Sequence, residues 1–120
     1  MAVYDSFFYT SPGGRDHNED AVGEKEYSCG SLFLLADGLG GHQRGEMASA
    51  CVVEAMQNAP EPGEEQPLSQ WMTQQISNAN QALLTLREST QWRMKSTLVA
   101  LFLGEKEVCW GHVGDSRLYY

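Results

Sequence analysis

A short apolar run that ends in an aspartate and a cluster of glycines is the feature that most restricts how this chain can fold. Residues 32–35 read Leu-Phe-Leu-Leu, and residues 36–42 read Ala-Asp-Gly-Leu-Gly-Gly-His. The apolar run predicts a buried strand over Ser31–Ala36, and the glycines predict a tight turn after it. Asp37 therefore lies where a strand ends. The strand would hold its carboxylate still, and the glycines would let backbone carbonyls approach a hard metal ion.

Two further acidic motifs have a similar setting. Asn18-Glu19-Asp20 lies upstream of Asp37, and Gly114-Asp115-Ser116-Arg117 lies near the end of the sequence. Carboxylates from all three motifs can share a small space only around a cation, because mutual repulsion would otherwise protonate some of them. Oxygen ligands of this kind select Mg²⁺ or Mn²⁺ over zinc. The three motifs together predict a metal centre.

Such a centre suits phosphoryl transfer. Two ions a few ångströms apart can lower the pKa of a bridging water and clamp a phosphoryl group for attack. Arg15 lies behind the Gly13-Gly14 turn and could offer a bidentate fork to the phosphate. Each motif alone has a plainer explanation, since Asp-Gly is usually a turn and Asn-Glu-Asp is usually solvated surface. A calcium-binding or purely structural α+β domain is therefore an alternative, although structure alone does not require Arg15 with all three aspartates.

Composition excludes several classes of function. The chain has 120 residues, enough for one domain or part of one, and a net charge of −8, which argues against non-specific nucleic-acid binding. The three cysteines are odd in number and far apart, so we expect buried thiols rather than disulfides or a zinc site. We see neither a signal-peptide pattern nor an apolar run long enough to span a membrane. We expect a cytoplasmic protein without a membrane partner.

The apolar pattern predicts an α+β fold. A first strand is expected over Val3–Thr10, and a helix from Gly45 to about Asn58. A proline-bearing loop over Pro60–Pro67 precedes a second helix from about Leu68 to Arg87, whose apolar residues form one stripe. The period then returns to two, which predicts strands over Thr97–Leu103 and Glu107–Val113, a turn at Gly104-Glu105-Lys106, and a last strand from Arg117 to Tyr120. Strands and helices segregate along the chain, which favours an antiparallel sheet with helices packed on it.

The ordered motifs resemble those of the metal-dependent protein serine/threonine phosphatases of the PP2C (PPM) type, in the bacterial branch. The resemblance is carried by residues 14–20 (Gly-Arg-Asp-His-Asn-Glu-Asp), 36–42, 45–49 (Gly-Glu-Met-Ala-Ser) and 113–119 (Val-Gly-Asp-Ser-Arg-Leu-Tyr). Residues 94–97 (Met-Lys-Ser-Thr) resemble the family's Met-Gly-Thr-Thr segment, with Lys95 in place of the glycine. The resemblance implies a sandwich of two antiparallel sheets flanked by helices. It also implies hydrolysis of phosphoserine and phosphothreonine on proteins by a metal-bridged water, opposing a serine/threonine kinase.

The resemblance also implies roles for individual residues. Asp37 would bridge two Mn²⁺ or Mg²⁺ ions, with the Gly38 carbonyl on one of them, and Asp20 would bind or orient metal-bound water. Asp115 would contribute to a third, more weakly held ion. Arg15 would hold the substrate phosphate. Glu19 and His42 would act from outside the ligand set, His42 either as a structural cap on the turn or as a catalytic acid.

The family's domain is considerably longer than this chain, and its second half supplies two more metal-binding aspartates. We therefore expect residues 1–120 to be the N-terminal part of a single phosphatase domain, weakly active or inactive on its own. A truncated, non-catalytic module that binds a phosphoprotein or another partner is the alternative.

Overall fold

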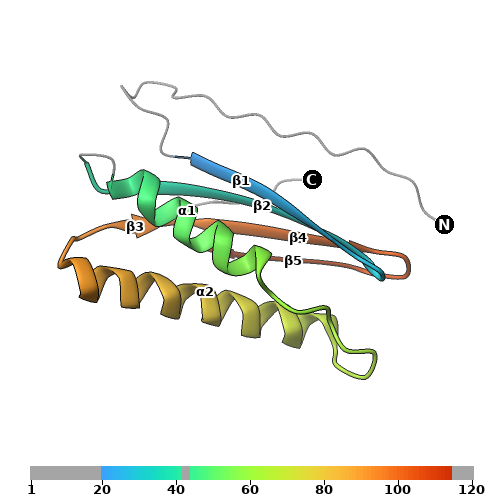
Figure 1. Ribbon diagram of the computed structural model, residues 1–120. Helices are drawn as coiled ribbons and strands as arrows, with labels where there is room; N and C mark the ends of the chain where they lie inside the picture. Colours follow the sequence, from blue (N-terminus) through green and yellow to red (C-terminus); the bar gives the residue numbers. More distant parts are fainter. Residues whose placement is uncertain (1–19, 42–43, 115–120) are drawn as a thin grey trace.

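The computed structural model of the chain describes residues 20–41 and 44–114, which form one antiparallel sheet and two helices (Figure 1). The elements follow one another as β1 (Asp20–Tyr27), β2 (Gly30–Leu39), α1 (Arg44–Gln57), α2 (Leu68–Thr90), β3 (Lys95–Ser96), β4 (Leu98–Gly104) and β5 (Val108–Val113). The strands lie in the order β1-β2-β4-β5, and the short β3 pairs with the far end of β2. The predicted antiparallel sheet with helices packed on it is confirmed.

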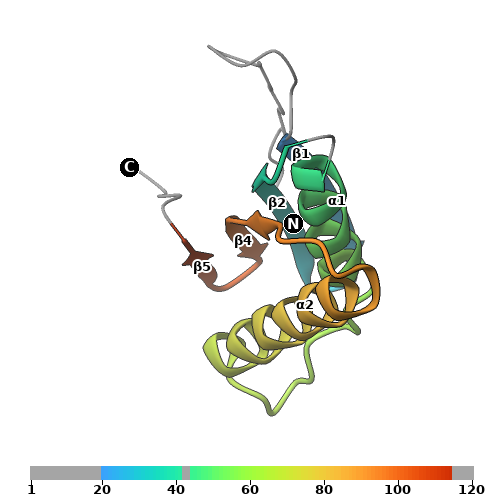
Figure 2. The same cartoon turned by 90° about the vertical axis from the view of Figure 1, so that its left-hand side faces the viewer.

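Both helices cover the same face of the sheet, as the turned view shows (Figure 2). On this face β2 and β4 place alternate apolar residues against the helices, and their side chains are at most 2% exposed: Leu32, Leu34, Ala36, Leu98, Ala100 and Phe102. Because successive strand residues point to opposite faces, the intervening residues lie on the other face. The sheet therefore has one side buried by helices and one side, here called the open face, without them.

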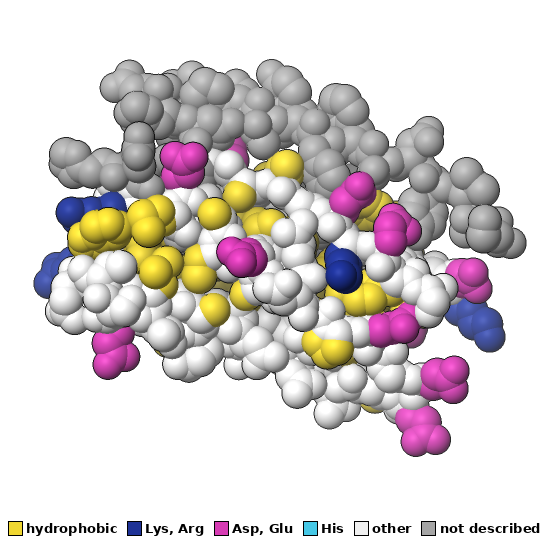
Figure 3. All heavy atoms as spheres, viewed as in Figure 1, with side chains coloured by type: hydrophobic (Ala, Val, Ile, Leu, Met, Phe, Trp, Pro, Cys, Tyr) yellow, Lys and Arg dark blue, Asp and Glu magenta, His cyan; other side chains and the backbone are white. Residues whose placement is uncertain are grey.

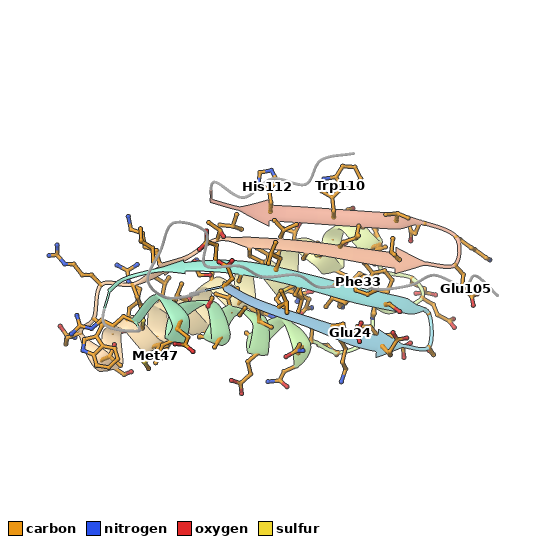
Figure 4. The ribbon with its side chains drawn as sticks, turned by 90° about the horizontal axis from the view of Figure 1, so that it is seen from above. Glu24, Phe33, Met47, Glu105, Trp110 and His112 are labelled. Carbon is orange, nitrogen blue, oxygen red and sulfur yellow. The ribbon has the colours of Figure 1, made fainter. Side chains whose placement is uncertain are left out.

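The open face is largely apolar as well. Cross-strand pairing places Phe33 opposite Leu101 and Leu101 opposite Trp110, so the three share this face. Leu35, Val108 and Trp110 are each at least 42% exposed. Figure 4 shows Trp110 and His112 projecting from β5 away from α1. An apolar sheet face is normally buried against another element.

An aromatic cluster anchors the core between the sheet and α2. Trp71 meets Phe102 edge-on at a ring-centroid distance of 5.6 Å and meets Tyr27 at 6.0 Å. The Tyr27 hydroxyl donates to the Ala59 carbonyl at 2.8 Å, and Trp71 Nε1 donates to the Pro60 carbonyl at 3.0 Å. Both polar tips therefore bind the loop between the helices, while the rings fill the core.

The sequence-based expectations for the helices and the hairpin are confirmed. The structure contains both helices, the proline-bearing loop and the β4–β5 hairpin, and α2 continues three residues beyond the expected Arg87. It also contains the buried strand, which continues to Leu39 and so includes Asp37 and Gly38, where the turn was expected. Helix α2 is capped by Gln91, which has a left-handed φ of 60° and donates its backbone N–H to the Arg87 carbonyl at 2.8 Å. The strands expected over Val3–Thr10 and Arg117–Tyr120 lie outside the described residues.

Two expectations were incomplete or wrong. The strand β1 was not foreseen, because Glu24, Lys25 and Glu26 are exposed on the edge of the sheet and hide its alternation. Cys29 was expected to be a buried thiol, but it is exposed in the turn between β1 and β2. All three cysteines are free thiols, and no described helix is long and apolar enough to cross a membrane.

Replacing Trp71 with alanine tests the aromatic cluster. We expect Trp71→Ala to lower the free energy of unfolding by about 3–5 kcal/mol, because it removes a large side chain that is 1% exposed. Urea titration followed by circular dichroism measures this loss. Leu84→Ala on the same helix is the control, since Leu84 is 42% exposed and should cost far less. Equal losses in the two variants would contradict the assigned core.

Candidate metal centre

Two of the predicted carboxylates lie directly opposite one another. Asp20 is the first residue of β1, and it is the cross-strand partner of Asp37 near the end of β2. Opposite residues of an antiparallel pair point to the same face, with Cβ atoms about 4.5–5.5 Å apart. The pairing of Val22 with Leu35 and of Glu24 with Phe33 continues this register, so both aspartates belong to the open face. Both are partly buried.

The paired aspartates form an oxygen-rich site that fits a divalent ion. Like charges directly opposite one another destabilise an antiparallel pair, and a cation held by both carboxylates would remove that repulsion. Oxygen ligands suit Mg²⁺ and Mn²⁺. Within residues 20–41 and 44–114 no group of three or more histidine, cysteine, aspartate or glutamate side chains could hold a metal ion. The described residues therefore bring two carboxylates together at this place, fewer than a complete ligand set needs, and the metal ligation by Asp20 and Asp37 stays a prediction.

The backbone of Asp37 is fixed by Thr97, in the short segment between β3 and β4. The Asp37 N–H donates to Thr97 Oγ1 at 3.1 Å, and the Thr97 N–H donates to the Asp37 carbonyl at 3.0 Å. Both β3 and β4 pair with β2, on either side of this contact. The strand end that carries Asp37 is therefore held from both edges, by β1 on one side and by Thr97 on the other. Thr97 was named from the sequence only as part of segment 94–97 and as the start of an expected strand, and its hydrogen bonds to Asp37 come from the structure.

Gly38 brings the start of α1 against the end of β2. A Cβ atom on Gly38 would lie 1.7 Å from the Gly45 carbonyl oxygen, so only glycine fits. Gly40 is similarly crowded, since its Cβ would lie 3.1 Å from Met94 Cβ and 3.2 Å from Arg44 Cβ. Gly41 has a left-handed φ of 56° and accepts a hydrogen bond from the Arg44 N–H at 2.9 Å. The glycines after Asp37 thus turn the chain tightly into α1.

Four of the predicted site residues, Arg15, Glu19, His42 and Asp115, lie outside the described residues, so their place in the site stays a prediction. Asp20, Asp37 and Gly38 are described, and the structure brings all three to one end of the β1–β2 pair. Lys95, which occupies a position expected to be tightly packed, is exposed on β3 and causes no crowding.

The thiols do not offer an alternative nucleophile. Burial raises the pKa of Cys51 and of Cys109, and the nearby Glu54 and Glu107 carboxylates raise them further. Burial also raises the pKa of Cys29, with Glu61 adding to the shift. Since a thiolate is the reactive form of cysteine, these groups stay protonated at neutral pH. The chemistry available at this sheet end is that of carboxylate oxygens.

Comparison with known proteins identifies the fold around these aspartates. A family profile described as protein phosphatase 2C matches residues 14–120. The chain belongs to the protein phosphatase 2C family. The serine/threonine phosphatase stp of Listeria welshimeri is 31% identical over 112 residues, covering 88% of this chain and 44% of that protein. The chain thus spans about half the length of the curated relatives it matches.

Two solved structures of the family superpose well on the chain. The catalytic domain of the serine/threonine protein phosphatase PstP, in complex with two manganese ions, gives a TM-score of 0.69 at 34% identity and covers 86% of this chain and 44% of that one. A bacterial serine phosphatase gives a TM-score of 0.78 at 33% identity, covering 91% of this chain and 47% of that one. The resemblance to bacterial phosphatases of the PP2C type is therefore confirmed.

The glycine contact at the end of β2 can be tested directly. We expect Gly38→Ala to lower the free energy of unfolding by about 1–3 kcal/mol or more, because the new methyl group would overlap the Gly45 backbone. Gly63→Ala is the matched control, since its Cβ would meet only Gln66 Cβ, at an ordinary 3.9 Å. Urea unfolding of both variants gives the comparison. A Gly38→Ala protein as stable as the control would contradict the close approach.

The hydrogen bond between the Asp37 N–H and Thr97 Oγ1 can be tested by substituting Thr97. Thr97→Val keeps the shape of the side chain but removes the acceptor of the Asp37 N–H. We expect a loss of about 1–3 kcal/mol in the free energy of unfolding, since a partly buried backbone donor would lose its partner. Thr97→Ser keeps the hydroxyl and should retain most of the stability. Identical losses for valine and serine would assign the effect to packing instead.

Proposed function

We propose that the chain is the N-terminal part of a metal-dependent protein phosphatase domain, residues 1–120, that hydrolyses phosphoserine and phosphothreonine on proteins. The observation that carries the proposal is the Asp20–Asp37 pair. In a chain of the protein phosphatase 2C family, two carboxylates lie opposite one another at a sheet end, and the backbone of one is hydrogen-bonded to Thr97. Phosphorylated proteins would be its substrates, and a serine/threonine kinase would oppose it.

Each site residue has a proposed task. Asp37 would bind both Mn²⁺ or Mg²⁺ ions, Gly38 would offer its carbonyl to one of them, and Asp20 would bind or orient a water on the same side. When bound, the ions supply a water activated for attack and neutralise charge on the phosphoryl group. The PstP complex with two manganese ions supports this choice of metal.

The remaining proposed tasks belong to residues outside the described part of the chain. Arg15 would hold the phosphate through its guanidinium fork, and Asp115 would contribute to a third, weaker ion. Glu19 and His42 would support the site without binding the paired ions.

A second candidate function is a non-catalytic module that binds a phosphoprotein or another partner. The observation that favours it is that, within residues 20–41 and 44–114, no group of three or more histidine, cysteine, aspartate or glutamate side chains could hold a metal ion. Hydrolysis of p-nitrophenyl phosphate by the chain with Mn²⁺ separates the two. Turnover would support a working phosphatase, in which a second copy could complete the ligand set. Mn²⁺-independent peptide binding without turnover would support the module.

Asp37→Asn is the sharpest test of the metal centre, because it keeps the size of the side chain and removes its charge. We expect the Mn²⁺ affinity, measured by isothermal titration calorimetry, to fall more than about a hundredfold. Any p-nitrophenyl phosphate turnover of the unsubstituted protein should be lost with it. Mutating a residue that only hydrogen-bonds to a metal ligand already lowers metal affinity or activity about 10- to 100-fold.

Glu24→Gln is the control for this prediction, because it removes an exposed carboxylate from the same face of β1. It should keep the Mn²⁺ affinity and the turnover of the unsubstituted protein. Retained Mn²⁺ binding in Asp37→Asn would reject the proposed ligand.

A further inference from the structure

At the end of the molecule where α1 begins and α2 ends, the chain gathers several cationic side chains (Figure 3). We use the name basic lip for Arg44, Trp92, Arg93 and Lys95, which come from the start of α1 and the segment between α2 and β3. The Arg44 guanidinium carbon lies 4.8 Å from the centroid of the Trp92 ring. Figure 3 shows dark blue cationic side chains next to an apolar patch at this end of the molecule, where α1 begins and α2 ends. A guanidinium above an aromatic ring is held in place while its N–H groups stay available.

The register of the sheet places Lys95 on the same face as Asp37. Lys95 is the cross-strand partner of Leu39, and opposite residues share a face. Leu39 is two residues beyond Asp37 on β2, which keeps it on the open face and places it about 7 Å further along the strand. The Lys95 side chain is exposed. It therefore borders the metal centre on the side away from β1.

The charges at this end differ from those of the whole chain. The chain carries a net −8, with only 8 lysine and arginine residues. Among the described residues, the first turn of α1, the last turn of α2 and the segment from α2 through β3 carry four cations (Arg44, Arg87, Arg93 and Lys95) and two carboxylates (Glu46 and Glu88). Their net charge is +2, without the two site aspartates. Within residues 20–41 and 44–114, Arg93 and Lys95 form no ion pair. Their charges are available to a partner.

We propose that the basic lip binds acidic residues that flank the phosphorylated side chain, so that the preferred substrates are acidic phosphorylated protein segments; this rests on the proposed function. The size of the lip favours a peptide over other polyanions. Binding to a nucleic-acid backbone commonly uses about 6–10 phosphate contacts, and binding to an anionic membrane commonly uses clusters of about 4–8 lysines and arginines. Three cations on an acidic chain match two or three carboxylates near one phosphate.

The test compares two phosphothreonine peptides with the intact protein and Mn²⁺. The peptides differ only at three flanking positions, which are glutamate in one and glutamine in the other. We expect the unsubstituted protein to favour the acidic peptide, measured as the ratio of the two kcat/KM values. In Lys95→Gln that ratio should fall about 1.5- to 5-fold, the effect of one exposed charge pair. Rising salt should reduce the preference in the same direction.

Two further variants separate charge from structure. Lys106→Gln removes an exposed lysine in the turn between β4 and β5, at the opposite end of the sheet, and should keep the ratio of the unsubstituted protein. Lys95→Arg keeps the charge and should keep the preference. The proposal would be overturned if Lys95→Gln lowered kcat/KM by the same factor for both peptides. It would also be overturned if the unsubstituted protein showed no preference between them.

A separate binding measurement distinguishes failure of the lip from failure of the phosphatase. If p-nitrophenyl phosphate is not hydrolysed by any form of the intact protein, the proposed function fails. Fluorescence anisotropy of the labelled acidic peptide in EDTA then still tests the lip, and weaker binding by Lys95→Gln than by Lys106→Gln would support it. Lysine-dependent binding to phosphatidylserine vesicles or to single-stranded DNA, without discrimination between the peptides, would overturn it in favour of those partners.

Discussion

The contact between the end of β2 and the first turn of α1 is the constraint on which the rest of this end of the molecule depends. At Gly38 the strand and the helix approach so closely that backbone lies against backbone. This contact sets the direction in which the chain leaves the sheet, and hence where Arg44 begins α1. The neighbouring Asp37 is held from both edges, by its pairing with β1 and by Thr97. The backbone that carries the carboxylate is therefore held by main-chain packing at Gly38 and by the Thr97 side chain.

The two faces of the sheet differ: one packs against the helices, and the other carries Asp20 and Asp37. One face is sealed by α1 and α2 around Trp71 and Phe102, and it supplies the core that this chain can form by itself. The open face carries the paired aspartates among apolar neighbours such as Phe33 and Leu101. Apolar surroundings strengthen electrostatic interactions near the aspartates, because they lower the local dielectric constant. The family's sandwich architecture would place a second layer over this face.

The sequence revealed the helices and the buried strands because their apolar spacing is regular. The stripe from Leu68 to Leu86 and the run at Leu32–Leu35 have the periods of a buried helix and a buried strand. The edge strand β1 escaped prediction because its residues are mostly polar or small, and edge strands commonly carry charges that prevent wrong pairing. Asp20 was singled out from its motif, yet its register opposite Asp37 could not be read from spacing. The roles of Thr97 and of Trp92 depend on contacts across the chain, 60 residues in the case of Thr97, which no local pattern encodes.

Asp20 and Asp37 lie opposite one another only when β1 pairs with β2 in the observed register. The two strands pair continuously from Tyr27 with Gly30 to Asp20 with Asp37, so the aspartates meet at the open end of a hairpin, eight pairs from its turn. A slip of one residue would send Asp20 to the helix-covered face. An ion that binds both carboxylates would therefore bind only the correctly registered hairpin, and by mass action it would stabilise that register over every other. Such a cation would hold the edge strand β1 in place, and the stability of the β1–β2 pairing would then depend on the concentration of the cation.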